Sequence, residues 1–324
     1  MKTEQKSIVF VADNNYILQF LVTLQSLLDN NNENFTIFLI TCELSEENKQ
    51  HLTKWENNNF TKINILQIDS SELDWLKCME RTWSRFMFLK LYIPYLVPKD
   101  IKKIIYLDVD MLIVDNITNL FNININNYAL AAVEDTPDCI KHKKRCNIPE
   151  NSPYINSGVM ILNLEMWRQA AENDLFWSFI KENSKKFAIN DQDVINYVFQ
   201  NKIKTIPLRF NVTNHCFGFK PNVLPYHKKQ LKEVYQHPAI IHFTNWNKPW
   251  IKGNYHLYKK KWQETEKKIC NIYSISPIQR HTTLKHRLVN VSKYILWKIF
   301  IIIKYRIWIT AGHLVPADFQ LFII

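Results

Sequence analysis

The sequence predicts an α/β fold in which a mixed, mostly parallel sheet is flanked by helices. Over residues 8–68, short apolar runs rich in β-branched side chains alternate with segments of helical spacing. Such alternation is typical of βαβ units, whose strands are parallel. The chain has 324 residues, 47% of them hydrophobic, which is enough for one large core and an appendage. Its 22% charged residues and 4 glycines exclude a disordered chain or a glycine-rich fibre.

The predicted strands are short apolar runs that end at polar or turn-forming residues. They cover residues 8–12, 35–40, 63–68, 104–107, 129–133, 157–164 and 239–243. The first predicted helix has apolar residues at helical spacing, and Ser45 can cap the second. They cover residues 16–28, 45–56, 81–97, 174–187, 191–199 and 259–268.

The net charge of +11 comes mainly from the C-terminal part of the chain. No Asp or Glu occurs between Lys267 and Ala317, and the nine basic residues of this segment leave the rest of the chain nearly neutral. A nearly neutral body argues against a nucleic-acid-binding protein. We therefore predict a catalytic domain over residues 1–255 and a small basic, aromatic-rich, helical appendage over residues 256–324.

The appendage is expected to associate with an anionic membrane surface. Its stretch 294–309 is too short and too charged for a membrane span, which needs roughly 20 mostly apolar residues. Its aromatic and basic side chains suit the membrane interface, and a hydrophobic helix packed on the body is the alternative.

The six cysteines include no Cys-x-x-Cys pair, and no secretory signal is visible. We expect a cytoplasmic protein on the inner face of the cytoplasmic membrane.

Two aspartates, Asp108 and Asp110, follow the buried run 104–107, where open α/β sheets place their ligands. One residue apart on a strand, they would share a face and repel each other. A divalent cation between them would remove this repulsion, although two solvated turn carboxylates would have the same spacing. Oxygen ligands alone suit Mg²⁺ or Ca²⁺, whereas His242, at the end of its own strand, would shift the preference to Mn²⁺.

A carboxylate-bound metal with open coordination positions can hold a diphosphate, and Lys248 could neutralise further charge. Glycine-rich phosphate loops are absent from the sequence. Asp13, Asn15 and Tyr16, at the end of the first strand, offer hydrogen-bonding groups and an aromatic face for a pyrimidine base. An Asx-turn beside a buried tyrosine is the alternative interpretation.

Five short motifs follow one another within residues 7–255. They are Ala12–Tyr16 (ADNNY), Tyr106–Asp110 (YLDVD), Asn156–Met160 with Asn163 and Leu164, Asp191–Asp193 (DQD) and His242–Trp250 (HFTNWNKPW). As an ordered set they resemble glycosyltransferase family 8, which includes bacterial lipopolysaccharide and lipooligosaccharide galactosyl- and glucosyltransferases and the glycogenins.

The resemblance implies a GT-A type, Rossmann-like fold, a UDP-sugar donor and a glycan or glycolipid acceptor, with no nucleic-acid partner. It also implies dependence on Mn²⁺, with Mg²⁺ as the alternative, and retention of the anomeric configuration. Metal ligands are implied at Asp108, Asp110 and His242, uridine contacts at Val11, Asp13, Asn15, Tyr16 and Val109, sugar contacts at Arg85, Asp135, Asn156, Asp191 and Gln192, and a diphosphate contact at Lys248. Asn245 departs from the family, because a glycine is usual three residues after the histidine.

The resemblance places Gln192 on the β-face of the sugar, and an amide is a poor nucleophile. We therefore expect same-face attack on an oxocarbenium-like sugar that Asp191 or Asp135 orients. A sugar-nucleotide-binding module and a metal-dependent UDP-sugar hydrolase are the alternatives. The sequence does not determine the donor hexose, the acceptor or the linkage.

Overall fold

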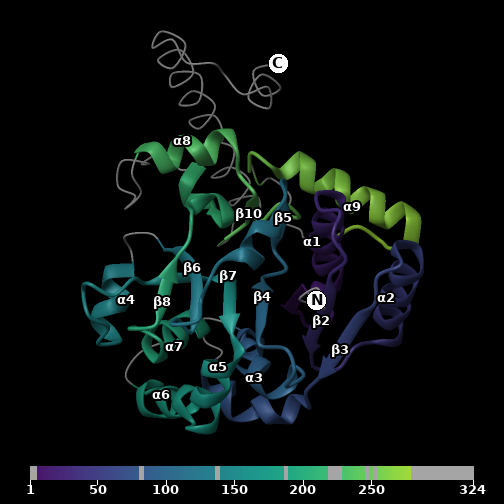
Figure 1. Ribbon diagram of the computed structural model, residues 1–324. Coiled ribbons are helices and arrows are strands. Elements are labelled where there is room, and N and C mark those ends of the chain that lie inside the picture. Colours follow the sequence, from purple (N-terminus) through teal and green to yellow (C-terminus); the bar gives the residue numbers. More distant parts are fainter. Residues whose placement is uncertain are drawn as a thin grey trace.

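The computed structural model describes residues 6–79, 84–135, 139–185, 189–217, 228–244, 248–251, 254 and 256–278 (Figure 1). Within these ranges the chain forms a seven-stranded sheet with the order β3-β2-β1-β4-β7-β6-β8. Strand β7 runs antiparallel to both of its neighbours, and the other pairs are parallel. The sheet is therefore mixed and mostly parallel, as the sequence predicts.

The elements have the following bounds. The large sheet contains β1 (Ser7–Val11), β2 (Thr36–Thr41), β3 (Ile63–Gln67), β4 (Lys103–Leu107), β6 (Leu130–Glu134), β7 (Ile155–Asn163) and β8 (Ile203–Thr205). A three-stranded sheet, ordered β5-β10-β9, contains β5 (Met111–Ile113), β9 (Val212–Thr213) and β10 (Ile240–His242). The α-helices are α1 (Ile17–Asp29), α2 (Glu46–Asn59), α3 (Ile93–Leu96), α4 (Cys139–Arg145), α5 (Leu164–Glu172), α6 (Leu175–Asn183), α7 (Asp191–Val198), α8 (Lys228–Gln236) and α9 (Lys259–Tyr273). The 3₁₀ helices are η1 (Asn14–Tyr16), η2 (Ser70–Met79), η3 (Arg85–Tyr92), η4 (Thr118–Asn122), η5 (Leu208–Phe210) and η6 (Asn214–Phe217).

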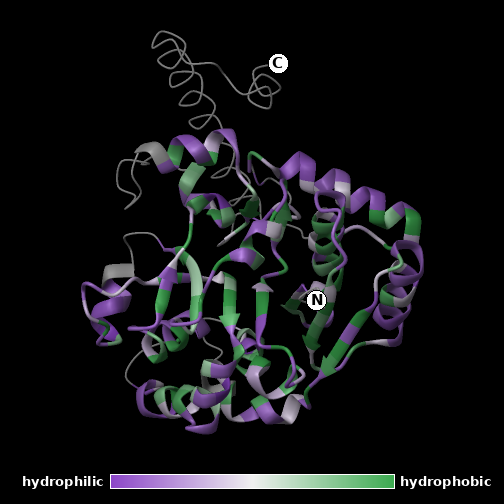
Figure 2. Ribbon diagram, in the orientation of Figure 1, coloured by the Kyte–Doolittle hydropathy of each residue, from purple (hydrophilic) through white to green (hydrophobic). Residues whose placement is uncertain are grey.

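The large sheet is buried on both faces. Along β1, Ile8 and Phe10 join a core shared with α1 and α9, whereas Val9 joins the core beneath α5, α6 and α7. The same alternation occurs on β4, because successive side chains of a strand point to opposite faces. Hydrophobic residues accordingly dominate the strands and α1 (Figure 2). This double burial explains why the strands read as continuous apolar runs.

The predicted helix over residues 81–97 is wrong in its geometry. Residues 85–92 form the 3₁₀ helix η3, and only four residues continue as α3. The main-chain N–H of Ile93 closes a three-residue turn on the carbonyl of Lys90. Pro94 has no N–H with which to continue an α-helical ladder from that point. Residues 80–83 lie outside the described ranges.

The second sheet joins the segment after β4 to a later part of the chain. Strand β10 pairs antiparallel with β5, which follows the Asp108–Asp110 segment directly. The N–H of Phe243 donates to the carbonyl of Asp110 at 2.9 Å, and the N–H of Asp108 donates to the carbonyl of Gly158 at 2.8 Å. These bonds tie the aspartate segment to β10 on one side and to β7 on the other.

Helix α9 lies on the outside of α1 (Figure 1). Its Trp262 and Ile269 are fully buried in the same core as α1, so the helix predicted over residues 259–268 is present and extends to Tyr273. The basic tail expected beyond it, residues 279–324, lies outside the described residues. Across the described ranges, no helix has the length and apolar character needed to cross a bilayer.

Candidate active site

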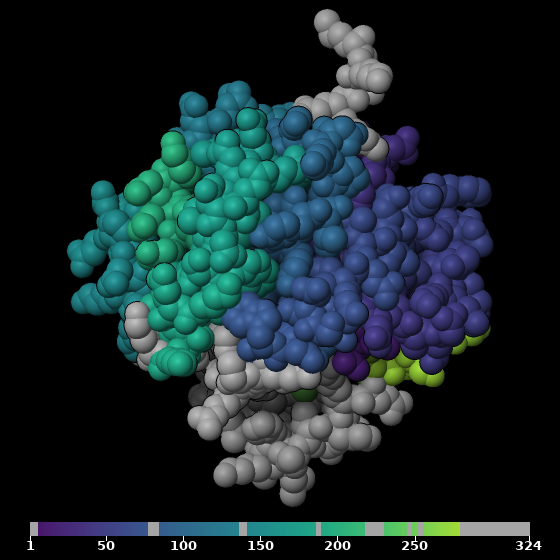
Figure 3. All heavy atoms as spheres, turned by 90° about the horizontal axis from the view of Figure 1, so that it is seen from below, coloured from purple at the N-terminus to yellow at the C-terminus, as the bar shows by residue number. Residues whose placement is uncertain are grey.

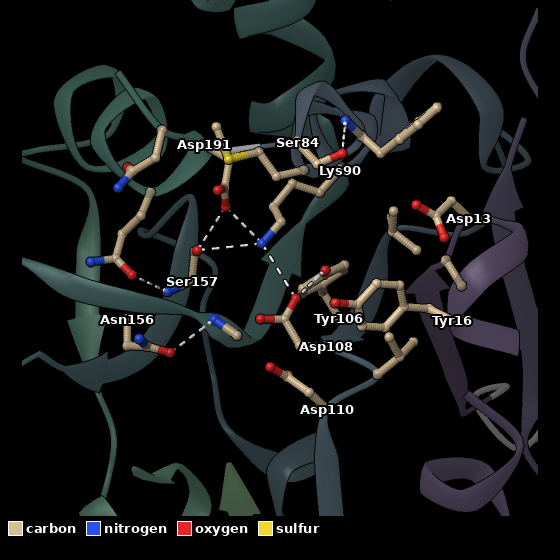
Figure 4. Close-up of a pocket in the computed structure, with 18 of the residues that line it drawn as sticks. Asp13, Tyr16, Ser84, Lys90, Tyr106, Asp108, Asp110, Asn156, Ser157 and Asp191 are labelled. Carbon is tan, nitrogen blue, oxygen red and sulfur yellow. Dashed lines mark hydrogen bonds and ion pairs between the residues drawn. The ribbon is translucent and has the colours of Figure 1, made fainter. Parts of the chain in front are cut away.

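A cavity of about 410 Å³ opens where β1 and β4 end (Figure 4). Its walls come from the residues after β1, the segment after β4, the start of β7 and the beginning of α7. The lining includes Val11, Ala12, Asp13, Tyr16, Ser84, Phe86, Met87, Lys90, Tyr106, Asp108, Val109, Asp110, Asn156, Ser157, Gly158, Asn190, Asp191, Gln192 and Lys248. Open α/β sheets bind ligands at this edge.

Two carboxylates and one imidazole converge at the cavity. Ligand atoms of Asp108, Asp110 and His242 all lie within 4.8 Å of one another. Nε2 of His242 is 3.1 Å from Oδ1 of Asp110 and 3.6 Å from Oδ2 of Asp108. Oδ1 of Asp110 is buried without a hydrogen bond of normal geometry within the described residues. A carboxylate oxygen in this state can accept a cation, and a donor set of two oxygens and one nitrogen fits a divalent metal ion.

A neighbouring amide fixes the orientation of His242. Oδ1 of Asn211 lies 2.9 Å from Nδ1 of His242, and Nδ2 of Asn211 donates to Oδ1 of Asn156 at 2.8 Å. Because an amide oxygen only accepts, Nδ1 of the imidazole must carry the proton in this contact. In the neutral ring Nε2 then presents its lone pair towards the two aspartates, which is the arrangement of a metal-binding histidine.

Gly158 makes room for this arrangement. A Cβ atom built at Gly158 would lie 2.3 Å from Cε1 of His242 and 2.9 Å from Oδ2 of Asp108. Both distances are far below van der Waals contact, and one of the two clashes involves a carboxylate oxygen of the triad. The backbone of β7 therefore approaches the triad more closely than any residue with a side chain would permit.

Lys248 supplies positive charge on one side of the triad. Its Nζ contacts Oδ2 of Asp110 and donates to the carbonyl of Phe243 at 2.6 Å. Burial by itself would raise the pKa of Asp110, but the ammonium of Lys248 outweighs it and holds the pKa well below its usual range. Asp110 is therefore ionised throughout the physiological pH range, and a carboxylate has to be ionised before it can bind a metal ion.

Lys90 supplies positive charge on the other side, and it is not among the residues predicted for the site. Its Nζ lies 2.7 Å from Oδ2 of Asp191 and 3.4 Å from Oδ1 of Asp108, and it donates to Oγ of Ser157 at 3.4 Å (Figure 4). Burial would lower its pKa, yet the two carboxylates raise it above the usual value. The only local signal is a lysine within the apolar run FMFLKLY of residues 86–92. A buried lysine is rare unless it is paired.

Tyr106 adds a hydroxyl to the same cluster. Its OH donates to Oδ1 of Asp108, and the ammonium of Lys90 lies 4.8 Å from the centre of its ring. Burial, with Asp108 nearby, raises the pKa of this phenol well above its ordinary value, so Tyr106 remains a donor. Oδ1 of Asp108 thus contacts the Tyr106 hydroxyl and the Lys90 ammonium, whereas Oδ2 faces His242.

The residues implied for uridine lie around the end of β1. Val11, Asp13, Tyr16 and Val109 all line the cavity. The carboxylate of Asp13 accepts from the main-chain N–H of Asn15 at 2.8 Å, so the Asx-turn considered as an alternative is present as well. Asn15 itself is exposed and does not line the cavity.

The residues implied for the sugar divide into two groups. Asn156, Asp191 and Gln192 line the cavity, and Asp135 lies behind Gln192, whose Nε2 donates to Oδ2 of Asp135 at 2.7 Å. Arg85 is placed elsewhere, because its Nη1 donates to Asp74 at 3.0 Å and the residue is absent from the cavity lining. Asn245 lies outside the described residues.

A buried carboxylate anchors the helix that carries Asp191 and Gln192. Asp193 forms a capping box with Asn190 at the start of α7 and accepts hydrogen bonds from Tyr154 at 2.7 Å and from Arg145. Burial alone would raise the pKa of Asp193, but His142, Tyr154 and Arg145 lower it. Its oxygens are occupied by structural partners, so Asp193 positions α7 and leaves Asp191 and Gln192 to face the cavity.

The sequence matches the family described as Glycosyl transferase family 8 over residues 7–253. The chain therefore belongs to glycosyltransferase family 8, and the prediction from its motifs is confirmed. Over 268 residues it is 27% identical to "General stress protein A" of Bacillus subtilis, covering 81% of this chain and 93% of that protein. Over 254 residues it is 26% identical to "Lipopolysaccharide 1,2-glucosyltransferase" of Escherichia coli, covering 77% and 74% of the two chains.

Among solved structures, the fold is similar to that of the galactosyltransferase LgtC in complex with donor and acceptor sugar analogues. The TM-score is 0.72 and the identity 20%, and the match covers 85% of this chain and 98% of that chain. The expected GT-A fold is thereby confirmed.

Proposed function

We propose that this glycosyltransferase moves galactose or glucose from a UDP-hexose to a glycan or glycolipid acceptor in lipopolysaccharide or lipooligosaccharide synthesis, with retention of configuration. The observation that carries the proposal is the convergence of Asp108, Asp110 and His242 in the cavity of a family 8 chain. The similarity to a lipopolysaccharide 1,2-glucosyltransferase supports the acceptor class.

The donor diphosphate would be held by two positive groups, a bound metal ion and Lys248. Asp108, Asp110 and His242 fit Mn²⁺, with Mg²⁺ as the alternative, and the bound ion would polarise the diphosphate oxygens as a Lewis acid. Lys248 would donate to the diphosphate from the side of Asp110. Tyr16 and the residues after β1 would hold the uracil ring. Groups that stabilise charge on a leaving oxygen commonly contribute about 10²–10³ in rate each.

Hydrogen bonds at the sugar end favour same-face attack. Gln192 is held at both ends of its amide, because Nε2 donates to Asp135 and Oε1 accepts from the N–H of Ser157 at 3.2 Å. Asp191 is neutralised by Lys90 and accepts from Ser157 Oγ at 2.8 Å. Neither group is arranged as a free carboxylate nucleophile. The bond from the anomeric carbon to the phosphate oxygen would break as the acceptor oxygen bonds from the same face, and the acceptor proton would pass to the departing phosphate oxygen.

The activity test supplies UDP-galactose or UDP-glucose with Mn²⁺, with and without a lipopolysaccharide core acceptor, and measures UDP release and the anomeric configuration of the product. Asp110→Ala should abolish turnover, whereas Gln192→Ala should retain part of it. UDP release that ignores the acceptor would support a hydrolase instead. An equally complete loss in both variants would contradict same-face attack.

Peripheral attachment to an anionic membrane through residues 256–324 stays a proposal. Each Lys or Arg near an anionic surface contributes about 1 kcal/mol, so part of the basic tail would be sufficient. Removal of residues 279–324 leaves the hydrogen bond from Ile278 to Glu266 in place. This truncated chain should no longer sediment with anionic vesicles, and binding of the full chain should fall at high salt. Unchanged binding of the truncated chain would refute the proposal.

A further inference from the structure

A second cavity, of about 350 Å³, lies between η2, η3 and α6. Its lining consists of Ser71, Glu72, Trp75, Tyr92, Trp177 and Lys181. The volume is within the range of small-ligand sites. Figure 3 shows the face of the molecule on which the blue residues of η2 and η3 border the teal residues of α6.

The two cavities share η3 but use different residues of it. Phe86, Met87 and Lys90 line the first cavity, whereas Tyr92 lines the second. The two lining sets have no residue in common. The second cavity is therefore lined independently of the first.

Three aromatic rings form one wall of the second cavity. The rings of Trp75 and Trp177 are 5.8 Å apart at 77°, and those of Tyr92 and Trp177 are 5.0 Å apart at 53°. The Trp75 side chain is 41% exposed, which is unusual for a tryptophan. Rings packed against one another at these distances leave no space among them for a ligand, so a ligand in the cavity would contact the exposed ring of Trp75.

Polar groups surround this aromatic wall. The Glu72 carboxylate forms no hydrogen bond or ion pair with the other residues that the structure describes. Lys181 Nζ lies 6.0 Å from the centre of the Trp75 ring and 3.4 Å from Asp174. Burial, together with Glu72, raises the pKa of Tyr92 to about 12, so its hydroxyl stays protonated at neutral pH. The cavity thus combines an apolar face with an anion, a cation and hydroxyl groups.

This combination suits a sugar better than an ammonium ion. An ammonium cage needs rings that surround the cation, and here the rings contact one another and Lys181 already brings a positive charge. A pyranose has an apolar C–H face and a rim of hydroxyls that both donate and accept. We propose that this cavity binds a pyranose unit of a glycan, with its apolar face on Trp75 and its hydroxyls bonded to Glu72, Ser71 and Lys181.

The experiment is a calorimetric titration of the full chain with maltose and with lactose, and with choline as the ammonium probe. Trp75→Ala should weaken disaccharide binding about tenfold, because it removes the stacking surface. Glu72→Gln replaces an exposed carboxylate without changing its shape, so it tests the site without endangering the fold. It should also weaken binding.

Two variants serve as controls. Tyr128→Ala removes an exposed aromatic residue that lines neither cavity. Like Trp75, Tyr128 has a lysine near its ring, because Nζ of Lys204 lies 5.8 Å from the ring centre. Lys248→Ala changes a residue that lines the first cavity. Both should bind the disaccharides as the wild type does, whatever the outcome of the activity test. Absence of disaccharide binding to the wild type, unchanged binding in Trp75→Ala and Glu72→Gln, equal weakening in Lys248→Ala, or binding of choline alone would each overturn the proposal.

Discussion

Gly158 is the residue on which the spacing of the candidate metal ligands depends most directly. Its missing side chain leaves the volume that the His242 ring and the Asp108 carboxylate occupy. The hydrogen bond from its N–H to Asn156 Oδ1, at 3.1 Å, also joins it to the amide chain that orients His242. One glycine therefore serves both the packing and the orientation of the ligands.

Gly158→Ala should lower Mn²⁺ affinity by roughly 10–100-fold, because the new Cβ displaces His242 or Asp108 from its position. Calorimetric titration with Mn²⁺ measures the effect. Val159→Ala, at the next position of β7, truncates a fully buried side chain on the core side and should keep the affinity. Wild-type affinity in Gly158→Ala would contradict this account of the triad.

Lys90 is a buried cation shared by two carboxylates, and its side chain is only 6% exposed. Lys90→Met should lower the free energy of unfolding by about 3 kcal/mol, since Asp108 and Asp191 are left without their common partner. Urea unfolding measures this loss. The matched control Lys49→Met breaks an exposed pair with Glu46 and should change the free energy by less than about 1 kcal/mol. Equal effects of the two substitutions would show that Lys90 is not a structural cation.

At the scale of elements, α9 closes the core on the side of α1. Its buried positions recur at helical spacing at Trp262, Glu266, Ile269 and Tyr273, and the opposite face is charged. Tyr273 also connects α9 to α2, because its OH accepts a hydrogen bond from Nδ2 of Asn59 at 3.0 Å. The boundary predicted at residue 255 therefore precedes a helix that packs on the body, and the division into two domains stays a prediction.

Trp262→Ala should lower the free energy of unfolding by about 3–5 kcal/mol, because a fully buried indole is replaced by a cavity. Thermal and urea unfolding measure the change. Lys261→Ala, one position earlier and exposed, is the control and should be nearly neutral. A small effect of Trp262→Ala would mean that α9 contributes little to the stability of the core.

At the scale of the whole molecule, acid should destabilise the fold partly through His256. Its ring is packed among Phe217, Phe243 and Tyr258, and burial lowers its pKa from 6.5 to about 3. Below pH 6.5 the unfolded chain therefore takes up a proton that the folded chain does not. The free energy of unfolding should fall by about 1.4 kcal/mol per pH unit from this group as the pH drops from 6.5 towards 3.

His256→Asn should make the free energy of unfolding less dependent on pH in this window, because the titrating ring is removed while an acceptor for the Tyr258 N–H is kept. Urea unfolding at several pH values between about 7 and 4.5 measures the slope. His237→Asn changes an exposed histidine and serves as the control. A slope equal to that of the wild type in His256→Asn would contradict the prediction.

The sequence by itself determined six of the seven strands of the large sheet, the helices α1, α2, α6, α7 and α9, and the set of motifs that identify the family. These features are local: apolar runs such as 104–107 predict buried strands, and Asp108 and Asp110 follow one of them directly. The candidate metal triad could be predicted because its members lie at the ends of predicted strands.

The tertiary structure decided which basic side chain of this segment lines the cavity and which groups orient the candidate metal ligands. Lys90 and Arg85 are five residues apart, and the sequence offers no physical reason to prefer Lys90 as the basic residue of the site. The fold buries Lys90 between Asp108 and Asp191. It pairs Arg85 with Asp74 instead. Asn211 reaches His242 only because β9 and β10 pair in the second sheet. Contacts between residues distant in the chain depend on how strands and helices pack, which local patterns do not encode.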